Sequence, residues 1–143
     1  MKRRILLTAL LLLLTGCQKE TPELARKVPT VEDEVEDNEA KAISSVKKIV
    51  NAQLDYSEGS GGGYAITLVD LRSRGLIDSA LESAVKDGYV FSMGSFGRVF
   101  TVNATPLTYG STGSRSFFSD QSGVIRYTAE ERPATADDRA LGH

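Results

Sequence analysis

Side chains able to act as nucleophiles or to bind metals are few in this chain of 143 residues. There is one cysteine, Cys17, and one histidine, which is the last residue, His143. A serine or cysteine triad needs a histidine base, and a histidine-based metal site needs several ligands held together by the fold. The sequence therefore argues against a nucleophilic triad and against a histidine-based metal site. What remains to be explained is the chemistry of a thiol that has no partner thiol.

The residues before Cys17 indicate what this thiol does. Residues 2–4 are basic and residues 5–14 are apolar except for one threonine, which is the order found in a secretory signal. A leucine, two small residues and a cysteine then resemble the lipobox of bacterial lipoprotein signals, where a thiolate takes up a lipid. The sequence predicts a signal peptide at residues 1–16, peptidase recognition by Leu14, Thr15 and Gly16, and lipidation at Cys17.

The apolar run is too short to cross a bilayer. Ten helical residues extend about 15 Å, half of a hydrocarbon core of roughly 30 Å. We therefore expect attachment through acyl chains on Cys17, in a bacterial cell envelope. The neutral Gln18 favours the outer membrane, facing the periplasm, by resemblance to sorted lipoproteins. The alternative is an ordinary signal peptide with an incidental cysteine.

Charge is distributed unevenly along the chain. Residues 17–39 hold eight acidic and three basic residues, a net charge of −5, whereas acids and bases balance from residue 40 onward. Residues 17–30 contain two prolines and little apolar content, so we expect a flexible tether. The near-neutral total gives no indication of nucleic-acid binding. Consecutive acids on a helix point in different directions, which argues against a metal site among residues 32–39.

An amphipathic helix is predicted for residues 31–56. Its apolar stripe consists of Ile43, Val46, Val50 and Leu54, widened by Ile49 and extended backward by Ala40 and Ala42. The early turns are acidic, which suits the positive end of the helix dipole. The glycine-rich residues 57–63 should end the helix.

The remaining segments predict short helices and four strands. Thr67 with Asp70 forms a capping box before a helix that stops at Gly75, and Asp78 can cap a second helix through residues 80–86. Alternating patterns mark strands at residues 89–93 and 99–104 around a hairpin at 94–97, and at 115–119 and 124–128 around a turn at 120–123. We expect an α+β domain at residues 31–129, with a long helix on a four-stranded antiparallel sheet. Residues 130–143 have little to bury and should form a mobile tail.

Residues 38–127 resemble the periplasmic head of type IV pilin-like proteins and type II secretion pseudopilins. The resemblance rests on an ordered series of positions: Asn38-Glu39-Ala40, Tyr56, Tyr64, Gly75-Leu76-Ile77-Asp78, Gly88-Tyr89, Pro106, Tyr109-Gly110, Arg115-Ser116-Phe117 and Ser122-Gly123-Val124. The prepilin peptidase site and the long apolar half-helix of that family are missing. The resemblance thus implies a pilin-type head behind a lipid anchor, with secretion or pilus machinery as its partner.

No enzymatic role is expected. Five aspartates lie at predicted caps, turns or helix ends, where a structural role is the default: Asp55, Asp70, Asp78, Asp87 and Asp120. Some pseudopilins hold calcium, but Asp120, Gln121 and Ser122 are too few ligands for it, so no metal or cofactor is predicted.

The predicted lipid anchor and the pilin-type resemblance lead to two functional hypotheses. The first is a structural or interaction component of the envelope, working with type II secretion or type IV pilus machinery. The alternative is a free-standing envelope lipoprotein that binds a peptide, glycan or small ligand. Four aromatic residues would form a recognition surface if exposed, or else fill the interface between helix and sheet: Tyr64, Phe96, Tyr109 and Phe118.

Lipidation can be tested directly. Cells grown with labelled palmitate should incorporate label into the wild-type protein and none into the Cys17→Ser variant, because the variant lacks the acceptor thiol. The measurement is the radioactivity or fluorescence of the immunoprecipitated protein. Equal labelling of the two proteins would contradict acylation at this residue.

Overall fold

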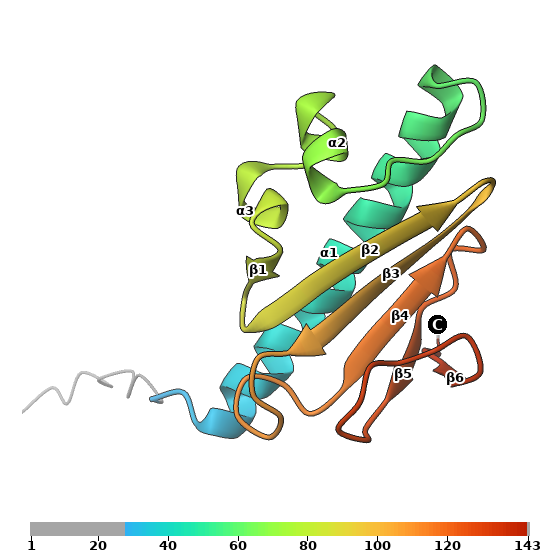
Figure 1. Cartoon of the computed structure of the whole chain (residues 1–143). Helices are drawn as coiled ribbons and strands as arrows, with labels where there is room; N and C mark the ends of the chain where they lie inside the picture. Colours follow the sequence, from blue (N-terminus) through green and yellow to red (C-terminus); the bar gives the residue numbers. More distant parts are fainter. Residues whose placement is uncertain (1–27, 143) are drawn as a thin grey trace, which may run out of the picture.

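The computed structural model describes residues 28–142, which fold as one long helix against one face of an antiparallel sheet (Figure 1). The predicted signal peptide, the lipidation site Cys17 and most of the predicted tether lie outside the described residues. The α+β class expected from the sequence is confirmed. In the part of the chain that is described, no helix is both long enough and apolar enough to cross a membrane.

Helix α1 spans Val31–Gly59 and begins at a capping box. The Thr30 hydroxyl accepts a hydrogen bond from the Asp33 amide at 3.2 Å, and the Asp33 carboxylate accepts one from the Thr30 amide at 2.9 Å. These bonds satisfy amides that the first turn leaves without intrahelical partners. The helix continues three residues past the predicted end at Tyr56, and the glycine-rich loop then stops it.

The buried face of α1 follows the predicted stripe at Ala42, Val46, Ile49 and Val50 and differs from it at the C-terminal end. Ala42, Val46, Ile49 and Gln53 are fully buried, while Leu54 is 40% exposed. Gln53 can be buried because its side-chain amide donates to the Ala65 carbonyl at 2.9 Å and accepts from the Ala65 amide at 2.8 Å. Hydrophobicity alone would place Leu54 in the core at this turn of the helix. Gln53 is buried there instead, because its side-chain amide is hydrogen-bonded inside the protein.

The sheet has six strands in the order β1-β2-β3-β4-β5-β6, and the prediction of four was wrong. The strands are β1 Val85–Lys86, β2 Tyr89–Phe96, β3 Val99–Pro106, β4 Ser116–Asp120, β5 Arg126–Thr128 and β6 Arg139–Ala140. The two unpredicted strands, β1 and β6, are two residues long, too short to show an alternating pattern.

Two predicted boundaries near these strands were also wrong. Helix α3 covers only Ser79–Glu82, because Ala84 has a φ of 61° and cannot continue a right-handed helix, which leaves Val85–Lys86 free to form β1. Strands β2 and β3 pair as far as Phe96 and Val99, so their turn is Gly97-Arg98 and not residues 94–97. Gly97 supplies the positive φ, 62°, that this tight turn needs.

Three local predictions are confirmed. Helix α2, Leu68–Ser73, has Thr67 as N-cap with a capping box to Asp70. Asp78 is the N-cap of α3, accepting from the Leu81 amide at 2.9 Å. In the β4–β5 turn, the Asp120 carbonyl accepts from the Gly123 amide at 3.0 Å.

The core lies between α1 and the inner face of the sheet. Its largest fully buried side chains come from β2, β3 and β4: Tyr89, Phe91, Phe100 and Phe117. Tyr89 depends on a close neighbour, since a Cβ atom on Gly113 would lie 2.1 Å from the Tyr89 hydroxyl oxygen. That approach leaves no room for any side chain at position 113.

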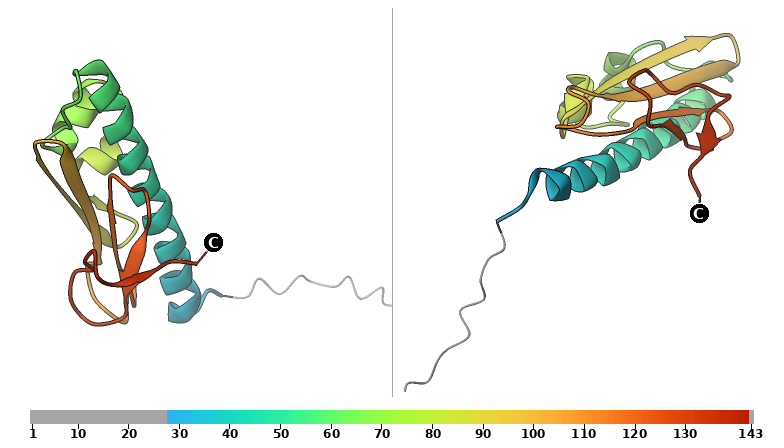
Figure 2. Two further views of the ribbon diagram at one scale, coloured as in Figure 1. Left: turned by 90° about the vertical axis from the view of Figure 1, so that its right-hand side faces the viewer. Right: turned by 90° about the horizontal axis from the view of Figure 1, so that it is seen from below.

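Residues 130–142 cover part of the outer face of the sheet, opposite α1 (Figures 1 and 2). The Ala134 carbonyl accepts from the Asn103 side-chain amide at 2.8 Å, and the segment then returns to form β6 beside β5. Ala134 is only 2% exposed and Phe118 only 7%. Within residues 130–142 Ala134 is the only buried residue, so hydrogen bonds more than apolar burial hold the segment on the sheet.

The contact between Tyr89 and Gly113 yields a stability prediction. Gly113→Ala should lower the free energy of unfolding by about 2 kcal/mol, because the added methyl group overpacks a buried site. Urea denaturation followed by circular dichroism measures this change. Gly63→Ala is the matched control, since its Cβ would meet only one atom, at an ordinary 3.8 Å. Equal stability of the two variants would contradict the close approach.

Candidate interaction surface

Residues 28–142 contain no group of three or more histidine, cysteine, aspartate or glutamate side chains that could hold a metal ion. The aspartates that cap helices or turns are engaged in local hydrogen bonds. The Thr67 hydroxyl and backbone amide, for example, hold the pKa of Asp70 below its usual value by bonding to its ionised form. These contacts account for Asp70, Asp78 and Asp120 as structural residues.

The most buried carboxylate, Glu39 on α1, is fully paired. Its oxygens accept hydrogen bonds from the Ser114 amide at 2.9 Å and the Arg115 amide at 3.0 Å, and the Arg115 guanidinium approaches to 2.6 Å. The Tyr89 hydroxyl donates to the Arg115 carbonyl at 2.8 Å, and burial raises the pKa of this hydroxyl. This cluster joins α1 to the loop before β4, and it leaves no group available for acid–base chemistry.

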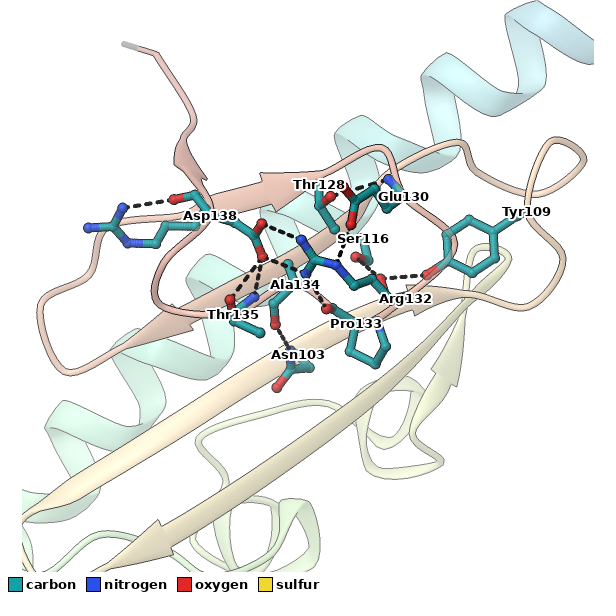
Figure 3. A network of polar contacts seen from close by, with 11 residues as sticks. Asn103, Tyr109, Ser116, Thr128, Glu130, Arg132, Pro133, Ala134, Thr135 and Asp138 are labelled. Carbon is teal, nitrogen blue, oxygen red and sulfur yellow. Dashed lines mark hydrogen bonds and ion pairs between the residues drawn. The ribbon is translucent and has the colours of Figure 1, made fainter.

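A second polar cluster holds the C-terminal segment (Figure 3). The Arg132 guanidinium donates to both carboxylate oxygens of Asp138, at 2.8 and 2.6 Å, and its Nε donates to Glu130 at 2.6 Å. The Arg132 carbonyl accepts from the hydroxyls of Ser116 and Tyr109. Arg132, followed by the Thr135 amide, holds the pKa of Asp138 well below its usual range. The cluster is a structural clamp on the outer face of the sheet.

The described part of the surface has several hollows that are partly open to solvent. One of about 600 Å³ lies beside Lys47, Val124 and Leu141, and another of about 440 Å³ lies beside Val31, Val35 and Arg115. Small-molecule sites are usually enclosed, with a few polar groups directed at one point. In the second hollow the Arg115 guanidinium is already bound to Glu39. The geometry therefore gives little support to ligand binding.

Phe96 is the one member of the four aromatic candidates that is largely exposed. Tyr64 packs on Phe100 with ring centroids 4.7 Å apart, Tyr109 bonds to the Arg132 carbonyl, and Phe118 is buried. Phe96, by contrast, is 87% exposed at the end of β2, directly opposite Val99, which is 48% exposed. We call Phe96, Val99 and the Gly97-Arg98 turn between them the hairpin tip.

The hairpin tip lies at the end of the molecule remote from residue 28, where the described chain begins (Figures 1 and 2). Helix α1 runs between these two ends, and its 29 residues span about 43 Å at 1.5 Å per residue. The tip thus stands far from whatever precedes residue 28. An exposed aromatic and an aliphatic side chain side by side are typical of a protein contact surface.

Comparison with known proteins found no family model, no curated protein and no solved structure that matches this chain. The sequence named Phe96 among four aromatics but had no signal to separate it from the buried three. The register of β2 and β3, which only the structure shows, places Phe96 opposite Val99 at the last pair before the turn.

The Asp138 clamp gives a pH-dependent prediction. Asp138→Asn should destabilise the protein at pH 7, because it removes a carboxylate that Arg132 and the Thr135 amide hold in its ionised form. The pKa of Asp138 is lower in the folded protein than its usual value of 3.8, so the ionised carboxylate stabilises the fold at pH values above 3.8. This stabilisation is lost as the pH falls below 3.8.

The measurement is the melting temperature of wild type and variant between pH 7 and pH 2. We expect the difference between them to shrink as the pH falls below about 4. Asp137→Asn, on the exposed neighbouring residue, is the matched control and should leave the melting temperature unchanged at both ends of the range. A difference between wild type and Asp138→Asn that stays constant with pH would contradict the assignment.

Proposed function

We propose that this protein is a lipid-anchored component of the bacterial cell envelope, with a structural or interaction role and no enzymatic activity. The mature chain would begin at Cys17, and its acyl chains would hold it in the outer membrane, facing the periplasm. The observation that carries the proposal is the position of the hairpin tip, exposed at the end of the domain opposite the anchored end.

The partner we propose is a protein of type II secretion or type IV pilus machinery. The sequence resemblance to pilin-type heads suggests this class, and the long helix on an antiparallel sheet is the arrangement expected for such a head. The hairpin tip supports a protein partner over a small ligand, because an apolar projection fits a hollow in another protein. The hollows of this domain are partly open to solvent, which also favours a protein partner over a small ligand.

A photo-crosslinking experiment tests this proposal. A benzophenone amino acid replaces Phe96 at the tip, or Leu107 as the matched control, in the full lipidated chain in its own cells. Leu107 is also an exposed apolar residue, at 52%, but it follows the opposite end of β3. We expect cross-links to secretion or pilus subunits from position 96 and none from position 107.

The same cells provide a second measurement. Phe96→Glu should lose most of the partner recovered from detergent-solubilised membranes, at least tenfold, whereas Leu107→Glu should retain it, since both side chains are exposed and neither change disturbs the core. Recovery of the partner at equal levels from both variants would contradict a role of the tip. Absence of secretion and pilus subunits from the cross-links would contradict the proposed partner.

A further inference from the structure

Gln53 connects the last turns of α1 to two other parts of the domain. Its side-chain amide is fully buried and bonds to the Ala65 backbone in both directions, donating at 2.9 Å and accepting at 2.8 Å. The same amide nitrogen also donates to the Met93 sulfur, Sδ, at 2.9 Å. One side chain thus joins α1 to β2 and to residues 60–67, which we call the 60–67 loop.

The 60–67 loop depends strongly on Gln53 for its position. Gly61 and Gly62 both have positive φ, and the hydroxyl bonds of Ser60 go only to Ser57 and Gly63. Beyond the bonds to Ala65, the loop contacts the core through Tyr64, whose ring centroid lies 4.7 Å from that of Phe100. Loss of the Gln53 bonds would therefore leave a glycine-rich segment held mainly by one ring contact.

Met93 is the reactive member of this group. It packs against the core but is partly exposed, so a small oxidant can reach it. A thioether sulfur is a weak hydrogen-bond acceptor with two lone pairs, and the Gln53 amide engages one of them. Oxidation of methionine to its sulfoxide turns an apolar side chain into a polar one.

We propose that Met93 is a site of reversible oxidation by peroxides, and that its sulfoxide releases the 60–67 loop from Gln53. A free lone pair of the sulfur attacks one peroxide oxygen, the O–O bond breaks and an S–O bond forms. The proton of the attacked oxygen passes to the departing oxygen, which leaves as water. The sulfur loses two electrons and the peroxide gains them, and a methionine sulfoxide reductase can return the thioether.

The contact distance explains why the loop is released. An oxygen that accepts the Gln53 bond must lie between the sulfur and the amide nitrogen, which are only 2.9 Å apart, so the two atoms have to separate. Because the same amide is bonded to both backbone groups of Ala65, its movement breaks or strains those bonds. An oxygen on the other side of the sulfur would instead place a polar group where Met93 packs against the core.

Hydrogen exchange after peroxide treatment tests the proposal. The purified full chain with Cys17→Ser is used, because the thiol would also be oxidised. Mass spectrometry of the Met93 peptide measures the gain of one oxygen, with free methionine in the same solution as the reference for reactivity. The exchange rate of the Ala65 amide, followed by NMR, measures release of the loop.

We expect Met93 to gain oxygen and the Ala65 amide to exchange about tenfold faster, as the loss of one or two hydrogen bonds predicts. The Gly123 amide, which bonds to Asp120 in the β4–β5 turn, should exchange at an unchanged rate. A sulfoxide reductase added afterwards should restore the original Ala65 rate. This chain carries no lipid and meets no partner protein, so the result does not depend on the proposed function.

Met93→Leu is the matched control, since leucine conserves the volume and cannot be oxidised. Its Ala65 exchange should be the same before and after peroxide. The proposal would be overturned if Met93 stayed unoxidised while free methionine reacted, or if Ala65 exchange did not change once Met93 was oxidised. Equal acceleration at Gly123, or a peroxide response in Met93→Leu, would also overturn it, by showing general unfolding or another reactive group.

Discussion

The fold depends on the neutralisation of one buried carboxylate. Glu39 is 6% exposed on the inner side of α1, and an isolated charge there would be costly to bury. The two amides and the guanidinium of residues 114–115 stabilise it together, so the loop before β4 must approach the helix at this point. Asn38 adds a bond to the Thr112 carbonyl at 3.1 Å. The start of the helix therefore fixes where β4 begins, and Gly113 is brought against the Tyr89 ring.

The Arg132–Asp138 clamp then determines which half of the outer face is covered. It holds residues 130–138 over β3 and β4, where Ser116 is fully buried and Asn103 bonds to the Ala134 carbonyl. The clamp does not extend to the far ends of β2 and β3. The two polar clusters thus stabilise the part of the domain near the first turns of α1, and they leave the hairpin tip uncovered.

Much of the local structure could be predicted because single residues specify it. Thr67, Asp78 and Gly123 each adopt the cap or turn for which their side chain or backbone freedom suits them. Only the last turn of the buried face of α1 was mispredicted, because the amide of Gln53 finds its partner on Ala65, twelve residues away, which hydrophobicity does not reveal. The role of residues 130–142 depends on pairing Arg132 with Asp138 and Asn103 with Ala134, contacts that exist only once the sheet has formed.

The exposure of Phe96 is not explained by the stability of this domain. A side chain that is 87% exposed contributes little burial, and Gly97-Arg98 would turn equally well after a polar residue. An exposed apolar ring instead raises the risk of aggregation. Phe96 lies at the end of β2, beside the Gly97-Arg98 turn and opposite the half-exposed Val99. Phe96 is therefore the residue of β2 that is better explained by binding than by folding.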